Sequence, residues 1–261
     1  MKVALIQLNA GQDKNQNIQN ACDLVKRATS KGASFILLPE VFNYRGPLSG
    51  KSMYEKIAEE IPGKSLMPLM EIAKKNGVHI LAGSIYERKL GGKKIYNTSV
   101  MIDDSGNIIG KYRKINLFKA VIDGQKIDES ETYEHGKEPV LCGIKNKKIG
   151  LSICFDLRFP ELYRNYFKEK VDLIVIPSSF SQKTGELHWK PLLRARAIEN
   201  YCYVLAPNQF GIDGHGVETY GNSMVIDPQG RVIATLEKKR EDILIVDLIF
   251  QERVFYPLVQ A

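Results

Sequence analysis

The sequence has few of the residues that build metal centres and disulfide frameworks. Its 261 residues include four cysteines and four histidines, and no two cysteines form a C-x-x-C pair. Scattered residues of these types lack the close spacing of a structural zinc site, and disulfide frameworks are uncommon in cytosolic chains of this size. We therefore expect no metal and no cofactor. Cys22, Cys142 and Cys202 lie in apolar patterns, and we interpret them as small core residues.

Long apolar runs and concentrated charge are missing as well. No stretch reaches the length of a membrane span, and Met1 leads into the strand-like "KVALIQL" instead of a secretory signal. We expect a protein of the cytoplasm that makes no membrane contact. The formal net charge is +7, but the basic residues are spread in small patches, whereas nucleic-acid binders cluster them among aromatic residues. The charge therefore does not favour a nucleic-acid partner.

Apolar patterns predict strands and helices in one continuous unit. Hydrophobic residues make up 44% of the chain, which is enough for a core, and no linker or repeat divides it. Strands alternate with helices in two regions and form hairpins elsewhere, which favours α/β layers with mixed sheets. We expect a single domain over residues 1–261, with residues 249–261 as a C-terminal tail. The expected helices cover 14–31, about 65–76, about 160–168 and 186–200.

Two segments carry more specific expectations. The segment "VHILAGSIYE" (78–87) has the apolar pattern of one strand. Residues 119–137 are polar and aperiodic, so we expect a long loop there. Loops of this length in compact domains are usually functional or disordered.

One cysteine stands in unusual surroundings. In "GLSICFDLRFPELYR" a buried strand stops at Cys154 and a charged turn begins with Asp156. A packing residue would lie earlier in the strand, whereas a nucleophile belongs at this junction. Glu40 after "FILLP" and Lys114 in "GKYRK" also follow apolar strands, where the ligand sites of α/β sheets lie. Together they offer a nucleophile, a base and a cation, which are the parts needed for acyl transfer.

Five separated segments resemble the carbon–nitrogen hydrolase (nitrilase) superfamily. "LLPEVF", "GKYRKINLF" and "GLSICFDLRFPELYR" are similar to its three signature segments in order and spacing, and "TGELHWKPLLRARAIENYCYVLAPNQ" and "YGNSMVIDPQG" resemble later blocks of its amidase branch. The resemblance covers the whole chain. It implies a four-layer αββα sandwich with two mixed sheets. It also implies a triad of Glu40, Lys114 and Cys154, with a second glutamate, Glu129 in "KIDES".

The chemistry of amide hydrolysis suits these roles. Cys154 would attack the carbonyl carbon as a thiolate, and Glu40 would take its proton and later move protons to the leaving amine and from water. Lys114 and the backbone N–H of Phe155 would stabilise the oxyanion. Glu129 would hold Lys114 and orient the substrate. The intermediate would be a cysteine thioester, and the products a carboxylic acid and ammonia.

Neighbouring residues are expected to support the sharp turn between strand and helix that carries Cys154, which we call the elbow. Asp156 and Glu161 would lock this elbow through hydrogen bonds. Asn116 departs from the resemblance, because the amidase branch often has His two residues after the lysine. This change leaves the triad intact but alters the local hydrogen bonding.

The resemblance also bears on the substrate. The amidase branch acts on deaminated glutathione and on omega-amides of 2-oxo acids, which carry a carboxylate away from the scissile bond. Because Lys114 is committed to the oxyanion, another cation must bind that carboxylate. Arg158 can bind it bidentately, and Thr184 in the loop "SQKTG" can add a hydroxyl; the resemblance points to the same two positions. Alternatively, Arg158 pairs only with Asp156 or Glu161.

Other readings stay open at this point. Nitrile hydrolysis and N-carbamoyl amide hydrolysis occur in the same superfamily. A Cys–His hydrolase would pair Cys154 with His188 or His215, and a catalytically inactive binding protein would keep only the fold. The intact Glu40, Lys114 and Cys154 argue against an inactive protein.

The resemblance further implies a homodimer. The candidate surfaces are the helix at 160–168, the helix at 186–200 and the apolar tail "FQERVFYPLVQA". Such a tail would be a liability if exposed, so it is expected to pack on a partner subunit or on its own domain.

Overall fold

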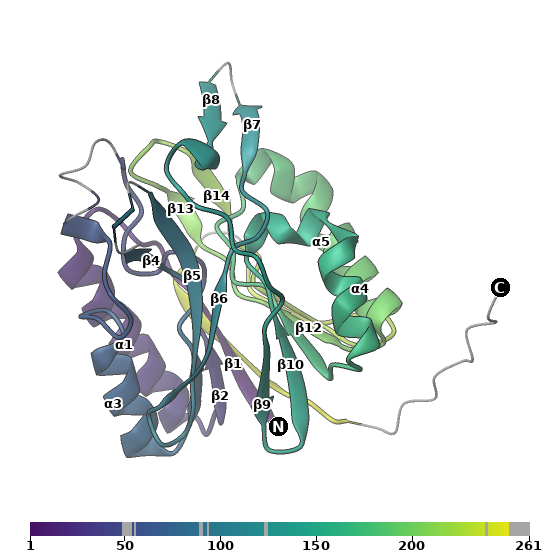
Figure 1. Cartoon of the computed structure of the whole chain (residues 1–261). Coiled ribbons are helices and arrows are strands. Elements are labelled where there is room, and N and C mark those ends of the chain that lie inside the picture. The colour runs from purple at the N-terminus through teal and green to yellow at the C-terminus, as the bar shows by residue number, and fades with distance from the viewer. Residues whose placement is uncertain are drawn as a thin grey trace.

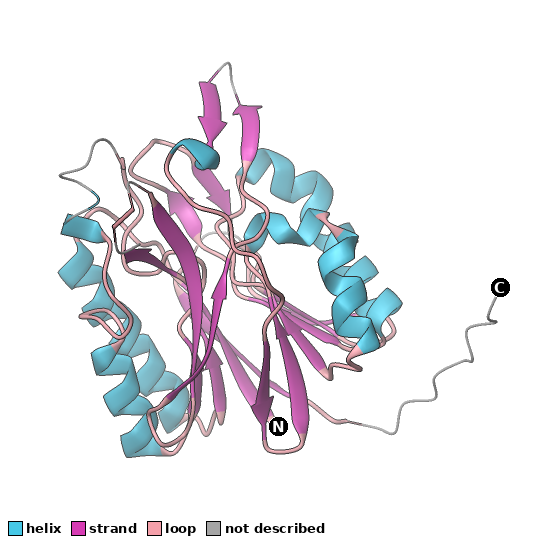
Figure 2. Cartoon of the chain, in the orientation of Figure 1, coloured by secondary structure: helices cyan, strands magenta, loops and turns pink. Residues whose placement is uncertain are grey.

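The computed structural model describes residues 1–48, 54, 56–88, 91–92, 94–122, 125–237 and 240–250. Helices α1 (Lys14–Ser30) and α3 (Met67–Asn76) lie on the outer face of one sheet. Helices α4 (Pro160–Lys168) and α5 (Gln182–Asn200) lie on the outer face of a second sheet (Figures 1 and 2). The predicted four-layer αββα sandwich is thereby confirmed.

Each sheet has parallel strands at its centre and antiparallel strands at its borders. In spatial order the first sheet is β17 (Asp242–Asp247), β1 (Lys2–Gln7), β2 (Phe35–Leu37), β3 (His79–Leu81), β5 (Ile95–Ile102) and β4 (Ile85–Arg88), with β6 (Ile108–Arg113) paired to β5. The second is β16 (Val232–Thr235), β15 (Met224–Ile226), β12 (Tyr203–Ala206), β11 (Leu173–Val175), β10 (Lys147–Leu151) and β9 (Leu141–Ile144). The parallel strands are β1, β2 and β3 in one sheet and β10, β11 and β12 in the other. The loops that follow these strands therefore gather at one edge of each sheet.

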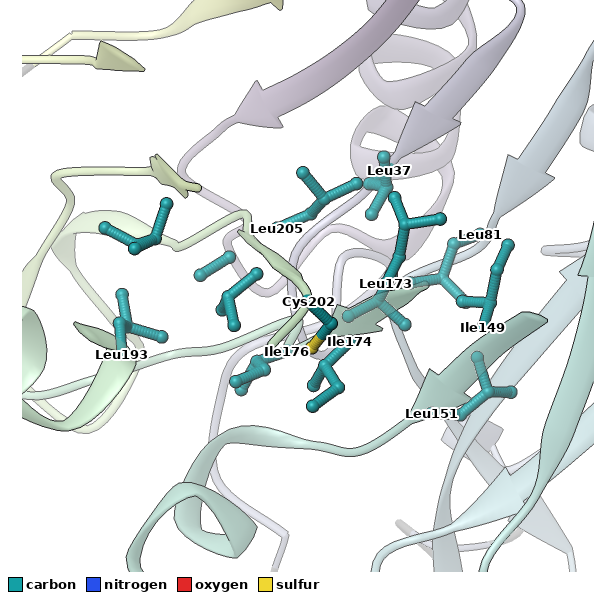
Figure 3. Close-up of a cluster of buried hydrophobic side chains, with 14 of the residues drawn as sticks. Leu37, Leu81, Ile149, Leu151, Leu173, Ile174, Ile176, Leu193, Cys202 and Leu205 are labelled. Atoms are coloured by element: carbon teal, nitrogen blue, oxygen red, sulfur yellow. The ribbon is translucent and has the colours of Figure 1, made fainter. Parts of the chain in front are cut away.

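The main core fills the space between the two sheets. Leu37 and Leu81 from the first sheet gather with Ile149 and Leu173 from the second (Figure 3), and all four are fully buried. Burial of each such side chain contributes about 1.5–3 kcal/mol. Cys202 belongs to the same cluster, so its interpretation as a core residue is confirmed. The other two cysteines given that interpretation are buried as well, namely Cys22 and Cys142.

The helix boundaries follow from local signals in the sequence. The Asp13 carboxylate accepts a hydrogen bond from the Gln16 N–H at 3.0 Å and caps α1. Pro68 lies in the first turn of α3, and Gly77 ends that helix with a φ of 62°, a left-handed conformation that glycine adopts without steric cost. The predictions of both helices are confirmed to within two residues.

The segment "VHILAGSIYE" forms two strands, β3 and β4, and not the single strand predicted. Gly83 separates them with a φ of 42°. A Cβ atom at this position would lie 1.9 Å from the backbone oxygen of Pro39. The close approach of two backbones thus breaks a pattern that looks continuous in sequence.

Two small hairpins stand at one end of the sandwich. Strands β7 (Lys119–Ile122) and β8 (Gln125–Asp128) form one (Figure 1), and a short 3-10 helix, η1 (Glu129–Glu131), follows it. The prediction of an aperiodic loop over 119–137 was therefore wrong. A ribbon that projects from the sheets need not bury one face, so its sequence shows no apolar alternation. The other hairpin joins β13 (Phe210–Ile212) and β14 (Glu218–Tyr220).

Helix α5 begins at Gln182 rather than at 186, which moves Thr184 from the predicted loop into the first helical turn. The early start of the helix was not predicted because Gly185 follows it, and glycine usually indicates a loop. Here the Tyr220 ring packs so closely that a Cβ on Gly185 would lie 2.4 Å from it. Glycine is needed for this contact.

No helix in the described ranges combines the length and the apolar composition needed to cross a membrane. Most of the predicted tail, residues 251–261, lies outside the described residues. Phe250, just before it, packs edge-on against Tyr203 of its own chain, with ring centres 5.4 Å apart.

Candidate active site

A pocket of about 220 Å³ lies where the loops after β2, β6, β10 and β11 meet. The structure brings all the predicted site residues to its wall. They are Glu40, Lys114, Glu129, Cys154, Phe155, Arg158 and Thr184. Glu40 follows β2 and Cys154 follows β10, as the common edge of parallel strands requires.

Lys114 is almost completely buried and lies between two carboxylates. Its Nζ is 3.0 Å from Glu40 Oε1 and 2.9 Å from Glu129 Oε2. Burial by itself lowers the pKa of Lys114, but Glu129 and Glu40 oppose this and raise the pKa well above its ordinary value. The ammonium group therefore carries its charge and cannot act as a base at neutral pH.

Glu40 accepts hydrogen bonds on both of its oxygens. Besides Lys114, the Asn97 Nδ2 donates to Oε1 at 2.8 Å and the backbone N–H of Ser179 donates to Oε2 at 2.9 Å. This arrangement suits an ionised carboxylate, which has no proton to donate. The backbone carbonyl oxygen of Asn97 also accepts a hydrogen bond from the Lys114 backbone N–H at 2.9 Å, so Asn97 positions both partners.

Glu129 reaches the pocket from η1. Its Oε2 accepts the backbone N–H of Phe118 at 2.7 Å, and its carboxylate faces Lys114. Burial raises the pKa of Glu129 and the charge of Glu40 adds to the rise, although Lys114 opposes it. Its place at the base of the β7–β8 hairpin ties that hairpin to Lys114.

Cys154 lies on a sharp turn of the backbone. Strand β10 ends at Leu151, three residues earlier than predicted, and Cys154 opens the 3-10 helix η2 (Cys154–Arg158). Its φ is 45°, in the left-handed region that costs about 1–3 kcal/mol for residues other than glycine. Its N–H donates to the Pro177 carbonyl oxygen at 3.0 Å, which holds this conformation.

The thiol of Cys154 is protonated at rest. Burial raises its pKa well above the ordinary value, and the charge of Glu40 raises it further, while Lys114 and the Ser179 N–H lower it. The carboxylate of Glu40 and the thiol line the same pocket and interact electrostatically. A base therefore lies near the proton that must leave before the sulfur can attack.

Asp156 locks the elbow, as predicted. Its Oδ2 accepts the Ile153 N–H at 2.9 Å and the Tyr112 hydroxyl at 2.7 Å. Its Oδ1 accepts both the backbone N–H of Asn116, at 2.8 Å, and the Asn116 side chain, at 2.9 Å. The prediction for Glu161 was wrong, since this residue is exposed in the first turn of α4 and takes no part in these bonds.

These bonds explain the asparagine that departs from the family pattern. Tyr112 and Asn116 flank Lys114, and both donate to the residue that fixes the turn of Cys154. Asn116 thus connects the lysine segment to the cysteine elbow. The buried Asp156 has a raised pKa, because burial outweighs these hydrogen bonds.

The backbone N–H of Phe155, the predicted second oxyanion donor, directly follows Cys154 in η2. None of the described residues accepts a hydrogen bond from it. The Phe155 ring packs edge-on against Phe118 and Phe159, with ring centres 5.0 and 5.4 Å apart. These contacts hold η2 against the hairpin base.

Arg158 does not pair with Asp156 or Glu161, the alternative considered from the sequence. Its Nη1 and Nη2 each lie 3.2 Å from His188 Nδ1. Its guanidinium also lies near the rings of Phe155 and Phe180, at 5.7 and 5.2 Å from their centres. Arg158 is half-buried and lines the pocket.

The two histidines of the Cys–His alternative lie apart from each other. His188 Nδ1 faces Arg158, whereas His215 lines the pocket from the exposed turn between β13 and β14. Glu40 is the acidic group whose charge acts on the thiol. In the described part of the chain, no three His, Cys, Asp or Glu side chains are grouped to hold a metal ion.

Comparisons with known proteins identify the family of the chain. The family described as carbon–nitrogen hydrolase matches residues 2–255. A deaminated glutathione amidase of Dictyostelium discoideum is 36% identical over 255 residues, which cover 95% of this chain and 87% of that protein. An omega-amidase of Mus musculus is 37% identical over 248 residues, covering 95% and 88%. The crystal structure of a nitrilase-superfamily member from Saccharomyces cerevisiae is similar with a TM-score of 0.83 at 33% identity, covering 94% and 89%.

Proposed function

The chain belongs to the carbon–nitrogen hydrolase family, and from this premise we propose that it is an amidase for small amides that carry a carboxylate. It is a hydrolase of carbon–nitrogen bonds other than peptide bonds. One observation carries the proposal: Lys114 Nζ lies 3.0 Å from Glu40 Oε1, and Cys154 lines the same pocket as both residues. A base, a fixed cation and a nucleophile thus share one pocket.

The first half of the reaction forms a thioester. Glu40 takes the thiol proton as the Cys154 sulfur bonds to the amide carbon, and the carbonyl oxygen becomes an oxyanion. Lys114 and the Phe155 N–H stabilise that oxyanion. When the intermediate collapses, the C–N bond breaks and Glu40 returns the proton to the nitrogen, which leaves as ammonia.

The second half releases the acid. Glu40 takes a proton from a water molecule, whose oxygen attacks the thioester carbon. The same two donors stabilise the second oxyanion. The C–S bond then breaks, the carboxylic acid forms, and the proton on Glu40 returns to the sulfur. Glu129 holds Lys114 in place throughout, since it contacts the same ammonium group from the other side.

Arg158 and Thr184 are proposed to bind the substrate carboxylate. Both line the pocket that holds Cys154, and a hydrogen bond between charged groups contributes about 1.5–3 kcal/mol. The named activities of the relatives support deaminated glutathione or an omega-amide of a 2-oxo acid as the substrate. Lys114 already contacts two carboxylates. Arg45, which also lines the pocket, is hydrogen-bonded to Asn9, Gln209 and Thr219, so Arg158 is the cation proposed for this task.

Ammonia release from a panel of small compounds tests the function. The panel pairs carboxylate-bearing amides with neutral amides of the same length, and adds matching nitriles and N-carbamoyl amino acids. We expect fastest turnover of the carboxylate-bearing amides. Faster conversion of the nitriles or carbamoyl compounds would replace the amidase assignment by that activity, and no turnover of any compound would favour an inactive binding protein.

We also propose a single domain, and a homodimer that forms through α4 and α5. Leu187 and Ile198 of α5 are 70% and 47% exposed. They lie three helical turns apart, so they share one face of the helix. Light scattering at micromolar concentration is expected to give twice the chain mass, and replacement of both residues by Glu is expected to give monomers. A wild-type monomer would contradict the dimer.

The cytoplasm is the proposed compartment. The four cysteines are all free, including the proposed nucleophile. A reducing compartment keeps such thiols unpaired. Fractionation of the native cells, with detection by antibody, is expected to find the protein in the cytosolic fraction.

A further inference from the structure

We infer that His188 is a positioning residue for the substrate carboxylate, and that it orients the Arg158 guanidinium without neutralising its charge. This inference rests on the proposed role of Arg158. It concerns a histidine that lies behind the arginine and is not itself part of the pocket wall. His188 would therefore act on substrate binding only through Arg158.

The contact fixes the chemical form of the histidine. A guanidinium has five N–H donors and no acceptor. Since both Nη atoms lie 3.2 Å from His188 Nδ1, that nitrogen must present its lone pair, and the proton of the neutral ring is on Nε2. The imidazole is thus an acceptor held in one tautomer.

The geometry also determines which donors are left for a ligand. His188 Nδ1 occupies the end of the guanidinium, where one N–H of each Nη group points in the same direction. The remaining edge, Nε–H with one further Nη–H, can still bind a carboxylate bidentately. His188 is the only acceptor for this guanidinium within the described ranges.

The partner of Arg158 must be neutral if Arg158 is to bind the substrate carboxylate. A carboxylate at the same place would form an ion pair with Arg158 and compete with the substrate. An imidazole restricts the rotation of the guanidinium and leaves its full positive charge. The nearest acid in sequence, Asp156, is fully occupied by donors from Ile153, Tyr112 and Asn116.

The support of His188 is rigid. Its neighbour Trp189 is fully buried, donates from Nε1 to the Asn222 carbonyl oxygen at 2.9 Å, and packs on Phe180 with ring centres 5.1 Å apart. Phe180 in turn lies against the guanidinium. Thr184 is four residues before His188, so both lie on one face of α5. One turn of α5 therefore carries both the Thr184 hydroxyl, which belongs to the pocket, and the His188 nitrogen, which orients the Arg158 guanidinium.

The test compares two replacements that differ in one acceptor atom. Asn Oδ1 occupies nearly the place of His Nδ1, so His188→Asn keeps the acceptor. His188→Leu has similar bulk and removes it. We expect His188→Leu to raise KM for a carboxylate-bearing amide about tenfold or more, with kcat and the KM for the matched neutral amide changed less than about twofold. His188→Asn is expected to restore most of the affinity.

Arg158→Lys separates this inference from the proposed function. If Arg158→Lys raises KM equally for both amides, the carboxylate role of Arg158 is wrong, and the inference falls with it. If Arg158→Lys is selective but His188→Leu is not, only the positioning role is wrong. In the double variant Arg158→Lys with His188→Leu, we expect the second substitution to have no further effect on KM, because the guanidinium that His188 orients is gone.

Thermal unfolding of each variant shows whether it folds. If His188→Leu does not fold, His188→Gln replaces it, since the Gln acceptor lies near the Nε2 position instead. A selective rise in KM for Gln but not for Asn would support the inference. Equal KM values for Gln, Asn and the unmodified enzyme would overturn it.

Discussion

Lys114 and Arg158, two of the cations that line the pocket, are held by opposite kinds of partner. Lys114 lies within 3.0 Å of two carboxylates, Glu40 and Glu129. Arg158 is held by a neutral imidazole and by two aromatic rings. Lys114, which is proposed to stay fixed during the reaction, is surrounded by opposite charge. Arg158, which is proposed to receive a charged ligand, keeps its charge available.

Because of this difference, we expect Lys114 to matter for the stability of the fold and Arg158 to matter for substrate binding. A buried ion cluster that loses one member leaves a charge without compensation, which costs about 3–5 kcal/mol. A half-buried arginine that faces neutral groups has no such dependence. We therefore expect changes at Lys114 to affect both folding and chemistry, and changes at Arg158 to affect substrate binding alone. The following variants test that division, in order of decreasing effect.

Cys154→Ala should give the largest loss of activity. Without the sulfur no thioester forms, and kcat is expected to fall at least about 10⁴-fold, while the unfolding temperature changes little. The matched control is Cys202→Ala in the core, which should lower stability and keep activity. Measurable thioester formation at another residue, or full turnover by Cys154→Ala, would remove Cys154 from the mechanism.

Glu40→Gln should move turnover and thiol reactivity in opposite directions. Loss of the base is expected to lower kcat about 10²- to 10⁴-fold. The charge of Glu40 raises the pKa of Cys154, so its removal lowers that pKa, and alkylation by iodoacetamide should reach its half-maximal rate at lower pH. Mass spectrometry of the Cys154 peptide follows the reaction.

Glu161→Gln is the control for this pair of effects, since Glu161 is an exposed glutamate on the helix that follows the elbow. It should change neither quantity. An alkylation profile of Glu40→Gln that moves to higher pH would contradict the electrostatic role of Glu40.

Lys114→Met and Arg158→Met test directly whether the two cations differ in their contribution to stability. In urea titrations, Lys114→Met should lose about 3–5 kcal/mol of unfolding free energy, and Arg158→Met less than about 1 kcal/mol. The pKa of Glu129 is already raised, and loss of Lys114 raises it further. A carboxyl with a raised pKa binds its proton more tightly in the folded state, so acidification should reduce the deficit of Lys114→Met. Equal losses for the two variants would show that the two cations are not held differently.

Asn116→Ala should give the smallest effect. The backbone N–H of residue 116 still reaches Asp156, and only one side-chain donor is lost. The expected cost is about 1 kcal/mol of stability, with a few-fold lower kcat and an unchanged KM, because the lysine segment and the cysteine elbow are less tightly joined. A change confined to KM would place Asn116 in substrate binding instead.

Much of the site was predictable from the sequence because its main residues follow apolar strands. Glu40, Lys114 and Cys154 each interrupt such a pattern with a reactive group. Ser179 was missed because it contributes a backbone N–H, which every residue except proline carries. Asn97 was missed because it lies inside a strand, and only the register of β5 turns it toward Glu40.

The fold shows the same limits. The α/β layers with mixed sheets followed from alternating strands and helices, since their buried faces leave a periodic pattern, whereas the four-layer arrangement was implied by the family resemblance. The break at Gly83 depends on the approach of Pro39, more than forty residues away in sequence, and no local pattern records such a contact. The partner of Arg158 was missed for a similar reason, because His188 reaches it from a different helix.

The two glutamates around Lys114 also affect the release of product. With both ionised, two negative charges face one positive charge at the place where the amide is cleaved. The amide that arrives there is neutral, whereas the acid that leaves is a carboxylate. Like charges a few ångströms apart in a buried site repel strongly. In the proposed mechanism, the residues that support bond cleavage would therefore also favour release of the new acid, and they would disfavour its return for the reverse reaction.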